Sequence, residues 1–219
     1  MNLEQHGAAH LPGAAAPFLD ALDAVVAGQP EGRAGIRLQA LDDLRGLLAP
    51  NRLGRFAVDI LGAAARPARA ILFDKSAATN WALGWHQDRT IAVQARADLP
   101  GFGPWSTKAG MIHVEPPFAI IEQMVTLRIH LDPVGVENAP LLIAPGSHAM
   151  GKLRDDAIAP AVARCGRHAC LAERGDIWMY RTPIVHASAR SESPTRRRRV
   201  LQVDYSADDL PPPLAWSGV

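Results

Sequence analysis

The sequence is poor in cysteine. Cys165 and Cys170 are the only two cysteines among its 219 residues. A structural zinc site usually needs four ligands, and no second Cys/His pair lies at zinc-finger spacing from these two. We therefore expect two reduced, largely buried thiols, as is usual for a cytoplasmic protein. The alternative is a metal site that also uses the intervening His168.

The chain also lacks an excess of charge and a long apolar run. Its 23 basic and 22 acidic residues give a formal net charge of +1, so the composition indicates neither nucleic acid nor an anionic membrane as a partner. Charged residues or prolines break the longest apolar stretches well before the roughly 18 residues of a membrane span. No basic segment followed by an apolar one, as in a secretory signal, opens the sequence, so we expect a cytoplasmic protein. The sequence gives no indication of the oligomeric state.

The first third of the chain has the apolar spacing of short helices. Residues 17–27, 41–49 and 51–64 carry apolar side chains at helical intervals. Residues 1–15 are rich in alanine, glycine and proline, and we expect them to form a loose lead-in. The sequence thus predicts a helical N-terminal part over residues 1–66.

From residue 67 onward the pattern changes to that of short strands. In residues 124–132, apolar side chains alternate with Thr126, Arg128 and His130, as in a strand with one polar face. Further strands are expected at residues 68–74, 85–93, 139–145, 176–180, 183–188 and 199–205. Helices followed by many strands predict an α+β, mainly β protein with a β-sandwich or barrel over residues 67–206. The length suits a single domain, residues 1–219.

One long segment interrupts the expected strands. Residues 94–118 are rich in proline and glycine and exceed the length of an ordinary loop. Insertions of this kind are usually functional lids or disordered segments. We interpret residues 94–118 as a lid over the mouth of the barrel.

Three side chains form a candidate metal site. His86 and Asp88 are two residues apart in an expected strand, where side chains at i and i+2 share a face and can bind one ion together. His186, in another expected strand, is the best candidate for the third ligand. Two histidines and one carboxylate leave three octahedral positions open, as in non-haem Fe(II) oxygenases. The alternative for the bare pair is a surface or hydrogen-bonded histidine.

Five short motifs occur in order between about residues 69 and 205: WHQD at 85–88, PGSH at 145–148, GD at 175–176, HAS at 186–188 and RRVL at 198–201. Together they resemble the phytanoyl-CoA dioxygenase-like family of Fe(II)/2-oxoglutarate-dependent oxygenases. The resemblance implies a double-stranded β-helix, a jelly-roll or cupin-like barrel, with the N-terminal helices packed outside. It also implies Fe(II), 2-oxoglutarate and O₂ as cofactor and cosubstrates. His86 and Asp88 resemble the proximal ligands of the metal, and His186 the distal one.

A run of arginines covers residues 196–199. The family has a basic residue about eleven positions after the distal histidine that pairs with the C5 carboxylate of 2-oxoglutarate, a task that suits the planar guanidinium. The spacing indicates Arg197, whereas the local pattern and the strand alternation favour Arg198, which we prefer. The alternative for the run is a solvated or nucleic-acid-binding patch.

Further site residues follow from the resemblance. Ser188 resembles the family's hydroxyl contact to the same carboxylate, and Arg128 stands where the family has a residue lining the cosubstrate pocket. An ion pair with an acidic neighbour is the alternative for Arg128. His148 is expected to shape a turn rather than to bind iron. Candidate substrate contacts are Trp85, Trp105, His113 and His130, with Lys75, Asn80 and Trp81 as additional candidates.

The resemblance implies hydroxylation of a small-molecule substrate with release of succinate and CO₂. Halogenating relatives have Ala or Gly in place of the metal-binding carboxylate, so Asp88 favours hydroxylation over halogenation. Two alternatives stay open. One is a cupin-type metalloenzyme that does not use 2-oxoglutarate, and the other is a non-catalytic barrel that binds a small ligand.

Overall fold

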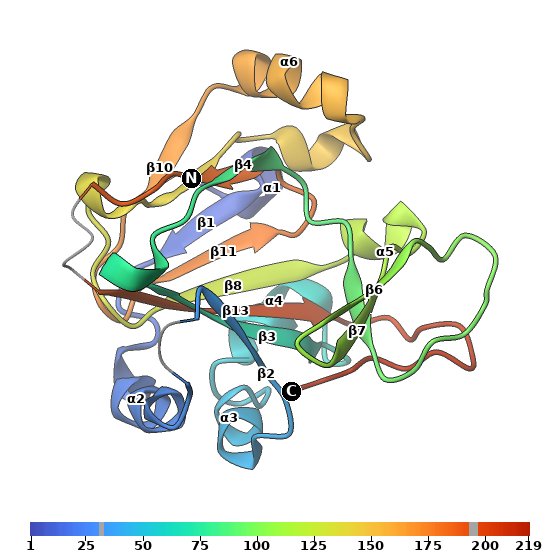
Figure 1. The fold of residues 1–219 in the computed structure, drawn as a ribbon, viewed down its shortest axis with the longest axis horizontal. Helices are drawn as coiled ribbons and strands as arrows, with labels where there is room; N and C mark the ends of the chain where they lie inside the picture. The colour runs from blue at the N-terminus through green and yellow to red at the C-terminus, as the bar shows by residue number, and fades with distance from the viewer. Residues whose placement is uncertain (31–32, 193–196) are drawn as a thin grey trace.

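Two antiparallel sheets face each other in the body of the protein (Figure 1). The structure is a computed structural model and describes residues 1–30, 33–192 and 197–219. The larger sheet has six strands, the smaller facing sheet has four, and a third sheet of three strands lies to one side. None of the helices in the described residues has the length and apolar character needed to span a membrane.

The larger sheet alternates between an apolar outer face and a polar inner face. Its strands lie in the order β1 (Ala8–Leu11), β11 (Ile177–Arg181), β8 (Val125–His130), β13 (Arg198–Ser206), β3 (Arg66–Lys75) and β2 (Gly35–Leu38). The apolar residues of β8 belong to the main hydrophobic cluster, whereas Thr126, Arg128 and His130 face the other way, as the alternation predicts. The inner face of this sheet therefore offers polar groups to the space between the sheets.

Short helices cover the outer face of the larger sheet. α2 (Leu19–Ala27), α3 (Asp42–Leu47) and α4 (Arg55–Leu61) pack their apolar sides on it; in Figure 1, α2 and α3 lie below the sheet and α4 lies behind it. Leu22, Leu44 and Leu53 are completely buried there against the outward side chains of the strands. The helical segments predicted within residues 17–27, 41–49 and 51–64 are thus confirmed.

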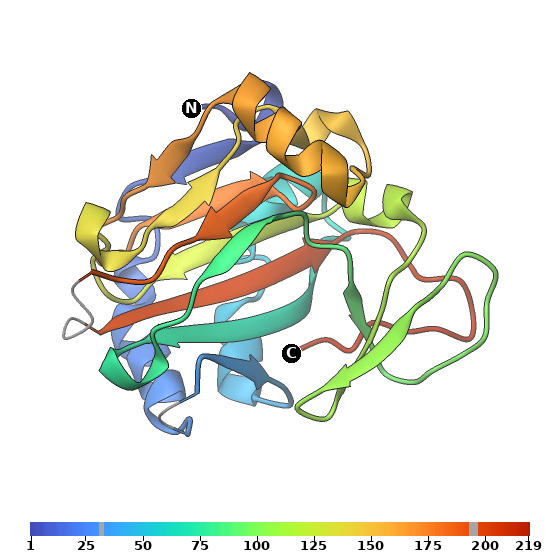
Figure 2. The same cartoon turned by 45° about the horizontal axis from the view of Figure 1, so that its top comes forward.

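The smaller sheet has the order β10 (His168–Cys170), β9 (Leu141–Ile143), β12 (His186–Ser188) and β4 (Leu83–His86). α6 (Asp155–Cys165) lies over its outer side, most clearly in Figure 2. With the larger sheet it forms the double-stranded β-helix that the sequence resemblance implies. The fold class, mainly β with helices outside, is confirmed.

The N-terminal part is not entirely helical. α1 (Leu3–His6) is followed by β1, which pairs with β11, and β2 pairs with β3, so both outer edges of the larger sheet come from residues 1–66. The expectation of a loose lead-in over residues 1–15 was wrong. Each of these strands has only four residues, and pairing with a longer neighbour stabilises it without a periodic pattern of its own.

The segment predicted as a lid contributes two of the three strands of a small sheet. β5 (Ile91–Val93), β7 (Met111–Val114) and β6 (Trp105–Lys108) pair with one another, and α5 (Phe118–Glu122) follows. This sheet packs on the C-terminal tail through Leu210, Leu214 and Trp216, at the right of Figure 1. The remaining short elements are the 3₁₀ helices at Ala16–Phe18, Ala77–Thr79, Val136–Asn138 and Ser147–Met150.

Both cysteines are free thiols, as the sequence predicts. Cys170 is buried, and burial raises the pKa of its thiol to about 12. Cys165 is partly exposed at the end of α6. His168 pairs with Ile143 in the smaller sheet and packs its ring against Trp178.

Candidate metal centre

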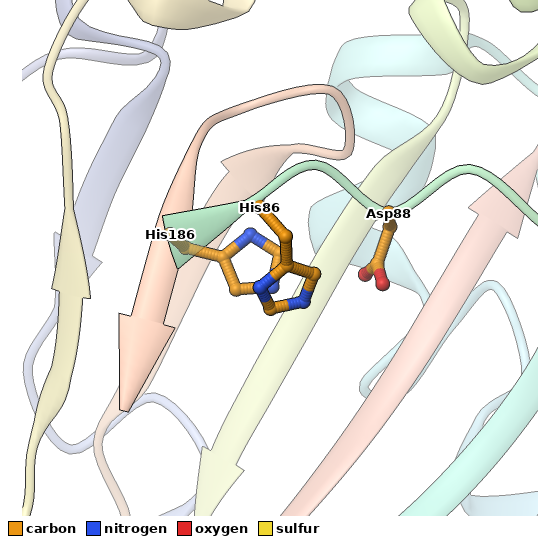
Figure 3. Close-up of side chains that lie close together, drawn as sticks. All are labelled: His86, Asp88 and His186. Carbon is orange, nitrogen blue, oxygen red and sulfur yellow. The ribbon is translucent and has the colours of Figure 1, made fainter. Parts of the chain in front are cut away.

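His86, Asp88 and His186 come together on the inner side of the smaller sheet (Figure 3). One candidate ligand atom of each lies within 4.8 Å of the others. His86 ends β4 and His186 begins β12, where the two histidines are directly paired across the strands, with ring centroids 4.3 Å apart. Among the described residues this is the one group of three or more such side chains that could hold an ion.

The hydrogen bonds of the two imidazoles leave one nitrogen of each for a metal. Nδ1 of His86 donates to the carbonyl of Gly84 at 2.7 Å, and Nδ1 of His186 donates to the carbonyl of Ile184 at 2.9 Å. A carbonyl oxygen only accepts, so the proton lies on Nδ1 and the lone pair on Nε2. Oδ2 of Asp88 is buried without any hydrogen-bond partner. An unpartnered carboxylate oxygen beside two free imidazole lone pairs fits a divalent metal ion.

The charges of the three groups suit the same conclusion. Burial opposes the charge on Asp88, but His186, Arg69 and His86 outweigh it and lower the pKa of that carboxyl below its usual value. Burial lowers the pKa of His186 to about 4, against the opposing influence of Asp88. Near neutral pH the site thus presents an ionised carboxylate and a neutral imidazole, the forms that bind metals.

Gln87, between the two proximal residues, was not singled out from the sequence. β4 ends at His86, so Asp88 lies just beyond the strand rather than within it. The buried amide of Gln87 points away and donates to the carbonyls of Gly151 and Pro183 at 3.0 and 2.8 Å, and it accepts from the backbone N–H of Leu153 at 2.9 Å. These bonds hold the turn that brings Asp88 back to the imidazoles. Its place between His86 and Asp88 in the WHQD motif was the feature of the sequence that could have indicated a role for Gln87.

A cavity of about 390 Å³ opens in front of the three residues. Both sheets line it, and it contains Arg128, Ser188 and Arg198. Arg197 lies on the other side of β13, where it contacts Asp74 at 2.7 Å. Of the two candidate arginines, only Arg198 faces the cavity.

Among the described residues, the arginine run does not form a free basic patch. Arg199 pairs with Asp132 at 2.7 Å and with Asp23 at 3.0 Å. Arg197 also has an acidic partner, Asp74. Arg196 lies outside the described residues. The described arginines of this run are therefore paired or buried, which disfavours the nucleic-acid interpretation.

Three buried cations gather around Ser188. Nζ of Lys75 donates to Oγ of Ser188 at 3.0 Å and to the carbonyl of Ala189, and Lys75 pairs with Arg198 across β3 and β13. Arg128 donates to Oε1 of Gln202 at 2.8 Å. Nε of Arg128 and Nε of Arg198 are buried without partners. None of the ion pairs among the described residues reaches these three cations, so the cluster can accept an anion.

The close spacing of these cations also alters their acidity. Burial, Arg198 and Arg128 lower the pKa of Lys75 to about 7. Burial and Arg128 lower the pKa of Arg198 to about 9. A bound anion would relieve this repulsion.

The four predicted substrate contacts are absent from the described lining of the cavity. Trp85 packs outside the smaller sheet with α6, and Trp105 packs in the side sheet against the C-terminal tail. His113 is buried, with Nδ1 donating to the carbonyl of Met111 at 3.0 Å, and His130 is buried beyond Arg128. These side chains are held in packed positions, and their role as substrate contacts stays a prediction.

The structure also places three other residues that the sequence analysis named. His148 lies in the 3₁₀ turn at Ser147–Met150 and donates from Nε2 to the carbonyl of Glu4, away from the three candidate ligands, as expected. Trp81 does line the cavity. Asn80 instead bonds to the backbone of Ser191.

Residues 3–200 match the model of the phytanoyl-CoA dioxygenase family. The chain belongs to the phytanoyl-CoA dioxygenase family. Iron and 2-oxoglutarate are the cofactor and cosubstrate of this family, with O₂, so the chain is an oxygenase-type enzyme, as the sequence resemblance implies. No curated protein matches the chain.

Three solved structures with the fold of this phytanoyl-CoA dioxygenase family member have low sequence identity to it. The non-haem α-ketoglutarate-dependent epimerase SnoN from nogalamycin biosynthesis is 17% identical, with a TM-score of 0.64 over 96% of this chain and 87% of its own. HygX from Streptomyces hygroscopicus, with nickel and 2-oxoglutarate bound, is 14% identical, with a TM-score of 0.61 over 93% and 84%. EctD from S. alaskensis is 15% identical, with a TM-score of 0.63 over 96% and 77%. These likenesses support the jelly-roll fold.

Proposed function

We propose that this protein is an Fe(II)- and 2-oxoglutarate-dependent dioxygenase that hydroxylates a small organic substrate and releases succinate and CO₂. One observation carries the proposal. The imidazoles of His86 and His186 and the unpartnered carboxylate of Asp88 converge within 4.8 Å at the wall of a cavity that also contains a cluster of buried cations. A metal site beside an anion site is the arrangement that this chemistry needs.

The metal is assigned to Nε2 of His86, Nε2 of His186 and one carboxylate oxygen of Asp88. When bound there, Fe(II) supplies the activation of O₂ and the oxidative decarboxylation of 2-oxoglutarate. The backbone carbonyls of Gly84 and Ile184 orient the two rings through Nδ1. Such outer hydrogen bonds fix the tautomer and the direction of a histidine ligand.

The cosubstrate is assigned to the cation cluster. Arg198 and Ser188 bind the C5 carboxylate of 2-oxoglutarate, and the ammonium of Lys75 adds a further donor beside Ser188. Arg128 compensates the remaining negative charge from the neighbouring strand. Arg197 has no part in this, because its guanidinium contacts Asp74 behind the sheet.

Hydroxylation is favoured because Asp88 retains a carboxylate at the position that halogenating relatives leave empty. The protein orients the substrate in front of the metal and excludes bulk water from it. The likeness to SnoN, an epimerase, shows that the fold accommodates another outcome. We propose residues 94–118 as the part that borders the cavity mouth, since Lys108 of this segment lines it.

The test combines spectroscopy with turnover. Under anaerobic conditions, Fe(II) and 2-oxoglutarate together should give a weak visible charge-transfer band. In air, the protein should form succinate from 2-oxoglutarate slowly without substrate. His86→Ala and His186→Ala should abolish both signals, and His148→Ala should retain them, because His148 is not in the group of candidate ligands and contacts the carbonyl of Glu4. Tight Zn(II) binding without a band would favour the cupin-type alternative, and equal loss in all three variants would overturn the ligand assignment.

A further inference from the structure

The cavity holds more positive charge than the cosubstrate accounts for. Beyond Arg128 and Arg198, four cationic side chains line it: Arg37, Arg69, Arg89 and Lys108. Asp88 is the single acid among its described lining residues. The excess positive charge must be balanced by acidic side chains outside the cavity or by a second anion bound inside it.

Two of these four cations are neutralised within the protein. Arg69 pairs with the buried Asp204 at 2.6 Å, and Arg89 pairs with Asp155 at 3.1 Å. Neither therefore needs an external anion.

Arg37 has no such partner. No described side chain pairs with its guanidinium, and its Nε is buried without a hydrogen bond. A buried donor without an acceptor costs about 1–3 kcal/mol, more for a charged group. Burial and the neighbouring Arg69 also lower the pKa of Arg37. The side chain is thus held in the cavity at a cost that a bound anion would offset.

The local sequence explains why Arg37 points inward. In β2, Ile36 and Leu38 are buried in the outer hydrophobic cluster, so Arg37 between them projects to the cavity side. Lys108, next to the tip of the β6–β7 hairpin, also lines the cavity, and it is exposed and without a hydrogen bond or ion pair among the described residues. Two separate segments therefore bring an unpaired cation to the same cavity.

Arg37 is too far from Arg198 to serve the same carboxylate. Arg37 is opposite Ile71 of β3, whereas Arg198 is opposite Lys75. Four residues of β3 separate the two rows, which is about 13 Å along the strand. Arg69 interacts electrostatically with both Arg37 and Asp88, so Arg37 belongs to the end of the cavity nearer that carboxylate.

We propose that Arg37, assisted by Lys108, binds an anionic group of the primary substrate, a carboxylate or a phosphate, and so directs the rest of the molecule toward His86, Asp88 and His186. The role as a substrate site rests on the proposed function. A cavity of about 390 Å³ limits this substrate to a small molecule. Its negative charge complements the cations that 2-oxoglutarate leaves unpaired.

The test is calorimetric titration of the protein saturated with Ni(II) and 2-oxoglutarate, so that the first anion site is filled. Benzoate and phenyl phosphate serve as anionic probes, and benzamide serves as the uncharged probe. We expect one anion to bind at least tenfold more tightly than benzamide, and the preferred anion identifies carboxylate or phosphate. Arg37→Gln should remove at least tenfold of that affinity, and Arg37→Lys should restore part of it.

The exposed Arg33, two residues before β2 and outside the cavity lining, gives the matched control. Arg33→Gln should bind the probes like the wild type, and Arg37→Gln should bind 2-oxoglutarate with unchanged affinity and melt at a similar temperature. Anions that bind no better than benzamide, or equally well to Arg37→Gln, would overturn the inference.

If the proposed function is wrong, the titration gives another result than if only the Arg37 site is wrong, because the wild type itself then does not bind 2-oxoglutarate. In that case the titration is repeated without 2-oxoglutarate in Arg198→Gln, where the first anion site is removed. Anion binding that persists there and disappears on adding Arg37→Gln supports the anion site by itself, and its absence rejects it.

Discussion

Arg197 and Arg198 are neighbours in sequence, yet their guanidinium groups lie on opposite sides of the larger sheet. Arg197 contacts Asp74 at 2.7 Å behind the sheet, and Arg198 is buried in the cavity between the sheets. Because side chains alternate along a strand, a shift of one residue exchanges these two environments. The register of β13 against β3 therefore decides which arginine faces the cavity.

The first prediction follows from that alternation. Arg198→Ala should raise the 2-oxoglutarate concentration needed for half-maximal succinate formation by roughly tenfold or more, because it removes a charge-assisted, bidentate contact. Arg197→Ala should leave this concentration within about twofold, since its ion pair is partly exposed and contributes little. A larger effect in Arg197→Ala would move the assignment one residue upstream.

The second prediction concerns Gln87. Gln87→Leu removes three hydrogen bonds and leaves the carbonyls of Gly151 and Pro183 and the N–H of Leu153 without their partner. The turn that places Asp88 should loosen, and the affinity for Ni(II) should fall by roughly 10- to 100-fold, as for other outer-shell residues. Competition with a metal-sensitive dye measures this.

Gln94→Ala is the matched control for the Gln87 variant, because the side chain of Gln94 is exposed and lies just after β5. Its Ni(II) affinity should equal that of the wild type. Unchanged affinity in Gln87→Leu would show that the chain around Asp88 holds its position without the amide.

Parts of this fold were predictable because single segments carry strong patterns. The alternation in residues 124–132 predicts β8 and its polar inner face, and helical spacing predicts α2. The edge strands β1 and β2 were not predictable, since four residues gain their stability from the neighbours that they pair with. α6 was not predicted from the sequence, and it continues through Pro160, a residue that is unfavourable inside a helix.

The site divides in the same manner. The family motifs predicted His86, Asp88 and His186 as candidate metal ligands. They also predicted Arg198 as the preferred cosubstrate residue. The cation cluster around Ser188 depends on the pairing of β3 with β13 that places Lys75 opposite Arg198. The sequence of either strand alone does not predict this register. Trp105, predicted as a substrate contact, packs in a hydrophobic cluster and is absent from the described lining of the cavity, a difference that the sequence does not reveal.

The third prediction concerns the buried pair of Arg69 and Asp204, whose closest atoms are 2.6 Å apart. Asp204→Ala leaves the guanidinium of Arg69 buried without its charge partner, which should lower the free energy of unfolding by about 3–5 kcal/mol. Urea unfolding followed by fluorescence measures this. Asp98→Ala removes the partner of the exposed Arg96 and should have no measurable effect. Equal stability of both variants would show that Arg69 finds another partner in the cavity.

The last prediction is a pH dependence of 2-oxoglutarate binding. Burial, Arg198 and Arg128 lower the pKa of Lys75 to about 7, so in the free protein its ammonium loses its proton as the pH rises through 7. A bound carboxylate favours the charged form, so binding above pH 7 must take up a proton, and affinity should fall as the pH increases. The Kd should rise roughly five- to tenfold between about pH 6.5 and about pH 8.0, as titration of one group requires. This range lies below the pKa of Arg198, which is about 9.

Calorimetry at several pH values measures the Kd, and Lys75→Met should bind more weakly but with a nearly constant Kd. Lys108→Met should keep the wild-type dependence, because Lys108 is exposed at the rim and away from Ser188. A slope that persists in Lys75→Met would assign the titration to another group.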